Sequence, residues 1–157
     1  MQAVVIGALM GVGGTAAMDI WAWLLSRLAG QAFPNWAMPG RWLAHVFRGR
    51  MWHADIGAAE AVPGELRLGW VFHYAVGVLY GVVFVVIAGT GWLAAPSFLP
   101  LWIFSIATIA AGWFLLQPGM GLGWAAARTA NPWKVRLMGL IAHTVFALGM
   151  WAVAVSA

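Results

Sequence analysis

The charged residues of this chain are confined to a few stretches of sequence. Its eight Lys and Arg and four Asp and Glu residues leave three long gaps: none precedes Asp19, none lies between Arg67 and Arg128, and none follows Arg136. Only 8% of its 157 residues are charged and 64% are hydrophobic, whereas a soluble domain has about 25% charged residues. A chain of this length has too little interior to bury so much apolar surface in water. The gaps therefore predict an integral membrane protein.

The apolar stretches are long enough to cross a bilayer. A hydrocarbon core of roughly 30 Å requires about 20 apolar residues in a helix. Four segments meet this requirement, at about residues 3–25, 69–88, 98–117 and 137–155. The uncharged turn over residues 89–96 is short, so the second and third helices are expected to be antiparallel neighbours. We predict an all-α fold, a single four-helix transmembrane bundle over residues 1–157.

The basic residues predict the orientation of these spans. All eight lie in or beside the first and third loops: Arg27, Arg41, Arg48, Arg50, Arg67, Arg128, Lys134 and Arg136. Four spans place these two loops on one side, and basic loops face the cytoplasm. Both termini are therefore predicted to be periplasmic or outside. Because the basic residues lie beside apolar spans, their expected partner is the bilayer rather than nucleic acid.

The first loop is predicted to have structure of its own. Residues 40–48 place Trp42, Leu43, Val46 and Phe47 within two helical turns, which predicts a short helix lying in the membrane interface. The same segment suggests contacts from Arg41, Arg48 and Arg50 to anionic lipid headgroups. Further along, Pro63-Gly64-Glu65 is typical of a helix start. Tryptophans near this predicted inner interface, typical of an aromatic belt, are Trp42, Trp52, Trp70, Trp124 and Trp133.

Three ionisable residues interrupt the apolar spans. Asp19, His73 and His143 each lie in a row of small residues spaced by three or four, which predicts that they face other helices rather than lipid. Each is six to eight residues from a basic flank, or roughly 9–12 Å at the rise of a helix. We therefore predict one polar layer in the cytoplasmic half, capped by Gln117. Polar groups of the first loop could cover it, namely Arg41, His45, His53, Asp55, Glu60 and Glu65.

Several chemistries fit this polar pocket. An ionisable group in a membrane interior suggests a functional site, although Asp19 could equally lock the packing by hydrogen-bonding a histidine. Two histidines and a carboxylate match a Zn or Fe ligand set of Asp19, His73 and His143. His73 and His143 could instead be the axial ligands of a haem b. A small-solute or proton-linked transporter would need polar groups continuing to the outer side.

Motifs along nearly the whole chain resemble a bacterial membrane-protein family, domain of unknown function 2938. They are Thr15-Ala-Ala-Met-Asp19, Gly40-Arg-Trp-Leu-Ala-His45, Gly49-Arg-Met-Trp-His53, Glu65-Leu-Arg-Leu-Gly-Trp-Val-Phe-His-Tyr74, Gln117-Pro-Gly-Met-Gly-Leu-Gly123 and His143-Thr-Val-Phe146. The resemblance implies four helices in the inner membrane, and it supplies no activity that could be carried over to this chain. It implies that Asp19, Arg41, His45, His53, Glu65, His73, Gln117 and His143 are the family's polar motif residues. The chain departs from the pattern at Arg128 and Ala130, where Ser and Pro are expected.

We predict a multi-pass protein of the bacterial inner membrane that is a binding or accessory subunit, with its His/Asp pocket open to the cytoplasm. A homo-oligomer or a larger membrane complex would suit that role. The alternatives are a metal- or haem-dependent membrane enzyme using Asp19, His73 and His143, and a transporter.

Overall fold

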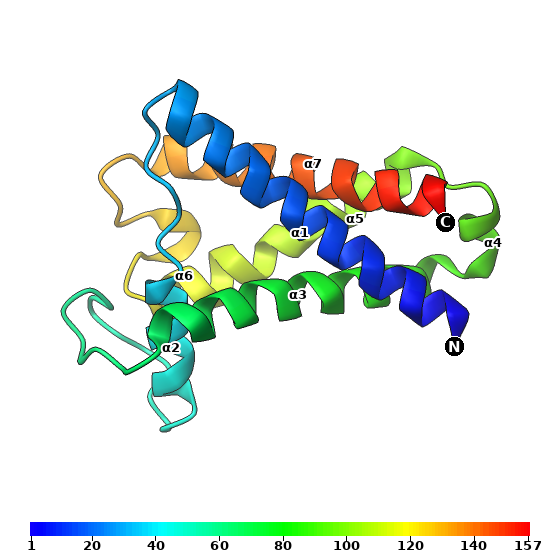
Figure 1. Ribbon diagram of the computed structural model, residues 1–157. Coiled ribbons are helices and arrows are strands. Elements are labelled where there is room, and N and C mark those ends of the chain that lie inside the picture. Colours follow the sequence, from blue (N-terminus) through cyan, green and yellow to red (C-terminus); the bar gives the residue numbers. More distant parts are fainter. The chain divides into compact units, whose positions relative to one another are not determined.

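The computed structural model describes residues 1–157, and they form helices without any strand. The helices are α1 (Gln2–Leu28), α2 (Ala37–Val46), α3 (Glu65–Ala88), α4 (Thr90–Ala94), α5 (Phe98–Ala111), α6 (Gln117–Gly119) and α7 (Pro132–Ser156) (Figure 1). A π-helical turn, Gly112–Leu116, joins α5 to α6, and a 3-10 turn covers Trp124–Ala126. The predicted all-α class is confirmed.

Four helices are long and apolar enough to cross a membrane: Gln2–Leu28, Glu65–Ala88, Phe98–Gly119 and Pro132–Ser156. They coincide with the four predicted spans and extend beyond them, because helices end at caps rather than at the edge of the apolar stretch. Glu65 begins α3 as predicted and accepts a hydrogen bond from the Val62 N–H (2.9 Å). At α7, Asn131 Oδ1 caps the Lys134 N–H (3.0 Å) ahead of Pro132.

The chain divides into two compact units, each described here by itself. The span unit comprises Met1–Pro34, Tyr74–Thr108 and Leu140–Ala157. The loop unit comprises Asn35–His73 and Ile109–Gly139. The single-domain bundle stays a prediction.

Glycines let the helices of the span unit approach closely. A Cβ on Gly7 would come within 2.8 Å of the carbonyl oxygen of Gly81 on α3, and a Cβ on Gly149 within 2.7 Å of the carbonyl oxygen of Gly13. The helix α1 therefore touches both α3 and α7 backbone to backbone, the mode that membrane helices favour. Both termini lie at the end of this unit that carries α4 (Figure 1).

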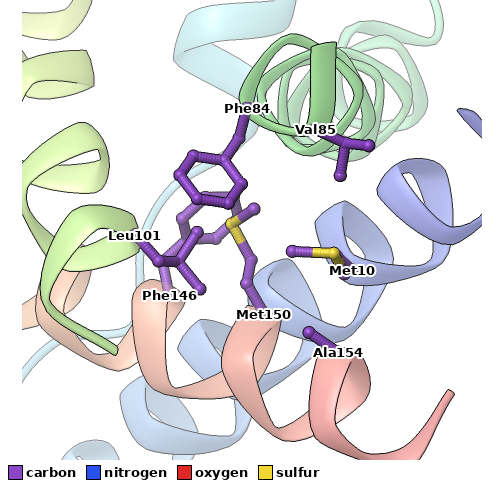
Figure 2. Close-up of a cluster of buried hydrophobic side chains, with 7 residues drawn as sticks. All are labelled: Met10, Phe84, Val85, Leu101, Phe146, Met150 and Ala154. Carbon is purple, nitrogen blue, oxygen red and sulfur yellow. The ribbon is translucent and has the colours of Figure 1, made fainter. Parts of the chain in front are cut away.

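The core of the span unit is small and apolar. Figure 2 shows side chains from α1, α3, α5 and α7 converging. Of these, Met10, Leu101 and Met150 are fully buried. Many large apolar side chains remain exposed on the same helices, among them Val5, Leu9, Ile20, Leu79, Val86, Ile87, Leu99, Ile103, Leu148 and Val155. Helices that are apolar all round require an apolar surrounding, which supports the membrane assignment.

The loop unit is built around α2. Gly40 on α2 faces the backbone of Glu65 and Gly69 on α3, so neither glycine leaves room for a Cβ. The predicted helix in the first loop is thus present, while its place in the membrane interface stays a prediction. Trp42 departs from the predicted belt, because it is buried in a core with Ile56 and Met120.

Proline at position 118 accounts for the π-helical turn. Pro118 has no N–H to donate to the carbonyl four residues earlier, and its ring crowds that carbonyl. The chain relieves this by widening the turn at Gly112–Leu116 and stops at α6, as predicted for Gln117-Pro118. Two glycines with positive φ then turn the chain away, Gly121 (φ 88°) and Gly123 (φ 74°).

Candidate functional site: a braced loop beside an open cavity

A buried arginine holds the first loop in place. Arg41 Nε and Nη2 donate to the two carboxylate oxygens of Glu65 (2.8 and 2.7 Å). Its Nη1 donates to the carbonyls of Ile56 (3.1 Å), Gly57 (3.2 Å) and Ala59 (3.0 Å). The planar guanidinium can donate two parallel hydrogen bonds to a carboxylate and further hydrogen bonds to other acceptors. With 8% of its surface exposed, Arg41 braces residues 56–59 against α2 and α3.

The ion pair keeps Arg41 charged. The hydrogen bond with Glu65 raises the pKa of Arg41 above its usual value. The buried cation is thereby matched by one carboxylate and by three carbonyls, as a buried charge requires. The brace is electrically neutral and internally satisfied.

Two buried histidines fasten the same loop to the last residue of α6. His45 Nδ1 and His53 Nε2 are 2.8 Å apart. On their outer sides, His45 Nε2 lies 3.1 Å from the Glu60 carbonyl, and His53 Nδ1 lies 3.1 Å from the Gly119 carbonyl. The His53 backbone N–H also donates to Gly119 (2.9 Å). Residues 45, 53 and 119 are thus linked through imidazole rings and backbone.

Beside this fastened loop lies an open cavity. It has a volume of about 300 Å³, and its walls are Trp52, Pro118, Gly123, Trp124, Ala127 and Arg128. Both indoles are largely exposed, Trp52 at 59% and Trp124 at 68%. Arg128 is the charged side chain of this wall. The cavity therefore combines two aromatic surfaces with one cation.

The turn that carries Trp124 is strained. Ala125 (φ 46°) and Ala126 (φ 60°) occupy the left-handed region, which costs a non-glycine residue about 1–3 kcal/mol and is typical of ligand clamps. Arg136 Nε holds the turn by donating to the Ala125 carbonyl (2.8 Å). Thr129 Oγ1 donates to the Ala126 carbonyl (2.8 Å).

The intramembrane residues have partners within their own units. In the span unit, the Tyr74 hydroxyl donates to Asp19 Oδ2 (2.9 Å). His143 Nδ1 lies 2.8 Å from the Ser105 carbonyl and 3.2 Å from Thr108 Oγ1.

Two further predicted pocket residues lie in the loop unit. The ring of His73 stacks on Trp36 at 3.8 Å between centroids. Gln117 Oε1 is buried without a hydrogen-bond partner. Of the eight predicted pocket residues, the structure links Arg41 with Glu65 and His45 with His53, both within the loop unit. The complete pocket stays a prediction.

Metal binding is not supported. The structure has no group of three or more His, Asp or Glu side chains that could hold a metal ion. The predicted Zn or Fe ligand set of Asp19, His73 and His143 was inferred from similar depth along separate helices, and similar depth does not bring side chains to one point. The haem hypothesis stays a prediction.

The predicted lipid contacts divide into buried and exposed residues. Arg41 is buried and bonded to Glu65 and to three carbonyls, and its contact with a headgroup stays a prediction. Arg48 and Arg50 are exposed and keep the predicted role.

Sequence reasoning missed the cavity and the tyrosine. The sequence pattern indicates only an interfacial position for Trp52 and Trp124, and for Arg128 only a topology signal and a departure from the family motif. Their positions carried the missing signal, because both tryptophans and the arginine lie in the two basic loops, which share one side in the predicted topology. Tyr74 is one of two tyrosines in the chain and follows His73 within a predicted span. Its hydroxyl was therefore a candidate hydrogen-bond partner for another polar residue of the spans.

A family model described as "Protein of unknown function (DUF2938)" matches residues 8–157. No curated protein and no solved structure matches the chain.

Proposed function

Because the chain belongs to the DUF2938 family, whose description assigns no activity, we propose a function from the site itself. We propose that the protein is a multi-pass membrane protein that binds a phosphate group, carried by a lipid headgroup or as a free anion, in the cavity beside the braced loop. This develops the binding role predicted from the sequence.

The observation that supports binding is the composition of the cavity wall. A guanidinium is the side chain best suited to bidentate contact with a phosphate. The exposed indoles of Trp52 and Trp124 suit the apolar part that adjoins a lipid headgroup, since tryptophan favours the interface between hydrocarbon and water. The volume of about 300 Å³ is at the lower end of ligand sites, which is adequate for a headgroup.

Binding is favoured over catalysis by the same wall. Its side chains provide a cation and apolar surface, while general acid–base chemistry needs an imidazole, carboxylate or similar group within reach of the substrate. Nearby, Arg41 is bonded to Glu65 and His45 to His53. These groups hold the loop that carries Trp52 and leave the binding to Arg128.

The proposal places the cavity on the cytoplasmic face of the bacterial inner membrane. The residues of its wall belong to the two basic loops, which the positive-inside rule assigns to the cytoplasm. Both termini would then be periplasmic.

A reporter fused after Ala157 tests this orientation. Alkaline phosphatase at the C-terminus is expected to be active and a fluorescent protein that matures only in the cytoplasm is expected to be dark. The opposite pair of results would invert the topology and remove the cytoplasmic site.

Lipid retention tests the binding itself. Wild-type protein is prepared in nanodiscs that contain phosphatidylcholine and phosphatidylglycerol. When native mass spectrometry releases it from the nanodisc, it is expected to retain phosphatidylglycerol. Arg128→Gln should lower the retained fraction at least about fivefold, because a charge-assisted hydrogen bond is lost. The matched control is Arg67→Gln, which removes an exposed arginine outside the cavity wall.

Two further arms identify the source of the phosphate. Millimolar inorganic phosphate that displaces phosphatidylglycerol would indicate a free-anion site, whereas retention in its presence indicates a lipid. Equal retention by wild type, Arg128→Gln and Arg67→Gln would refute the cavity as the binding site.

A further inference from the structure

The contacts of His45 and His53 fix which ring nitrogens carry a proton. A carbonyl oxygen can only accept a hydrogen bond, so a ring nitrogen that faces one must donate. His45 Nε2 faces the Glu60 carbonyl and His53 Nδ1 faces the Gly119 carbonyl. Both outer nitrogens therefore carry hydrogen.

This assignment leaves the inner contact one proton short. A neutral imidazole has one N–H, which the outer nitrogen of each ring already holds. The inner nitrogens, His45 Nδ1 and His53 Nε2, would then be two bare acceptors held 2.8 Å apart. That distance is normal for a hydrogen bond, and a single added proton between the rings satisfies all four nitrogens.

We propose that His45 and His53 form a proton-binding site, which holds one proton between His45 Nδ1 and His53 Nε2 and carries one positive charge. With neither proton nor charge between them, one ring would have to turn its lone pair toward a carbonyl. With two protons, two N–H groups would face each other. The singly protonated pair satisfies every contact that the structure shows.

The charge of the pair lies in a buried setting and within electrostatic reach of one carboxylate. Only 5% of His45 and 6% of His53 is exposed, so the proton is shielded from solvent. Glu65, at the start of α3, attracts the charge of His45 and is itself paired with Arg41 on α2. The other charged side chains of this loop are exposed, namely Arg48, Arg50, Asp55 and Glu60.

The shared proton makes the attachment of the loop depend on pH. The pair joins α2 to Gly119 by way of His53. Because the bound proton belongs to the folded arrangement, its stabilising effect is present in the singly protonated pair and is lost as the pH rises and that proton leaves.

Nitrogen-15 NMR of histidine-labelled protein tests the proposal. At pH 7.5, three of the four ring nitrogens of the pair are expected to be protonated. Assignments come from the single variants His45→Asn and His53→Gln, with His73→Gln as a control outside the pair. Two protonated nitrogens at this pH, one on each ring, would overturn the proposal.

One variant separates the shared proton from a simple packing role. In His45→Asn the amide N–H replaces the Nδ1 position and can donate to His53 without an added proton. Hydrogen exchange of the His53 and Ile56 amides, corrected for intrinsic rates, should become faster between pH 7 and 9 by at least about tenfold in wild type. After the same correction, the exchange rates of these amides in His45→Asn should not change over this pH range. Equal pH dependence in both proteins would contradict a shared proton even if the variant is less stable.

Discussion

Gly77→Ala is expected to lower the melting temperature in detergent by about 6–12 °C. The reason is that a Cβ at position 77 would press into the Thr15 hydroxyl and lie 3.1 Å from the Gly11 carbonyl oxygen on α1. Overpacking of this kind costs about 3 kcal/mol, because the Thr15 hydroxyl is held by its hydrogen bond to the Gly11 carbonyl (2.8 Å) and the helical backbone beside it cannot move aside. Gly81→Ala meets the Gly7 carbonyl in the same way and should behave alike.

Gly112→Ala is the matched control for these two substitutions. Its Cβ would meet nothing within 4 Å, and alanine is the better helix former by up to about 1 kcal/mol. Its melting temperature should therefore stay level or rise. If Gly77→Ala and Gly112→Ala have the same melting temperature, the close contact between α1 and α3 is not a source of stability.

Arg41→Met is expected to release the first loop. The substitution keeps the apolar stem but leaves the Glu65 carboxylate and the carbonyls of Ile56, Gly57 and Ala59 without their donor. Cleavage by a protease within residues 54–60 should become at least about tenfold faster, because cleavage follows the population of the opened loop. The matched control is Arg50→Met, which removes an exposed arginine and should be cleaved at the wild-type rate.

Two further variants distinguish the brace from a simple ion pair. Arg41→Lys keeps the charge but cannot match the planar fork, so it should restore little protection. The exchange Arg41→Glu with Glu65→Arg keeps an ion pair, yet a carboxylate cannot donate to the three carbonyls. Wild-type protection in either variant would show that charge attraction alone holds the loop.

Charge and apolar length were sufficient to predict the spans. A gap in charge is a local property of the sequence, and a helix in hydrocarbon satisfies its own backbone, so no distant partner had to be known. The helix start at Glu65 and the stop at Gln117-Pro118 were predictable for the same reason, because caps and prolines act on adjacent residues.

Pairing between polar residues was not predictable in the same way. The depth of Asp19 or His143 along its helix does not specify which neighbour lies beside it, and the structure gives Asp19 a tyrosine and His143 a carbonyl of α5. The brace joins residues 24 positions apart, Arg41 and Glu65. No local periodicity reports such a contact. The sequence placed Arg41 in an amphipathic segment and gave no sign of the acceptors that it meets within the loop unit.

The central claim is that an anion sits between Trp52, Trp124 and Arg128, and assigned indole N–H resonances test it most directly. On addition of phosphatidylglycerol to protein in phosphatidylcholine nanodiscs, the resonances of Trp52 and Trp124 should shift while that of the buried Trp42 stays in place. Both shifts should be absent in Arg128→Gln. Unchanged Trp52 and Trp124 resonances, or equal shifts in Arg128→Gln, would contradict the account.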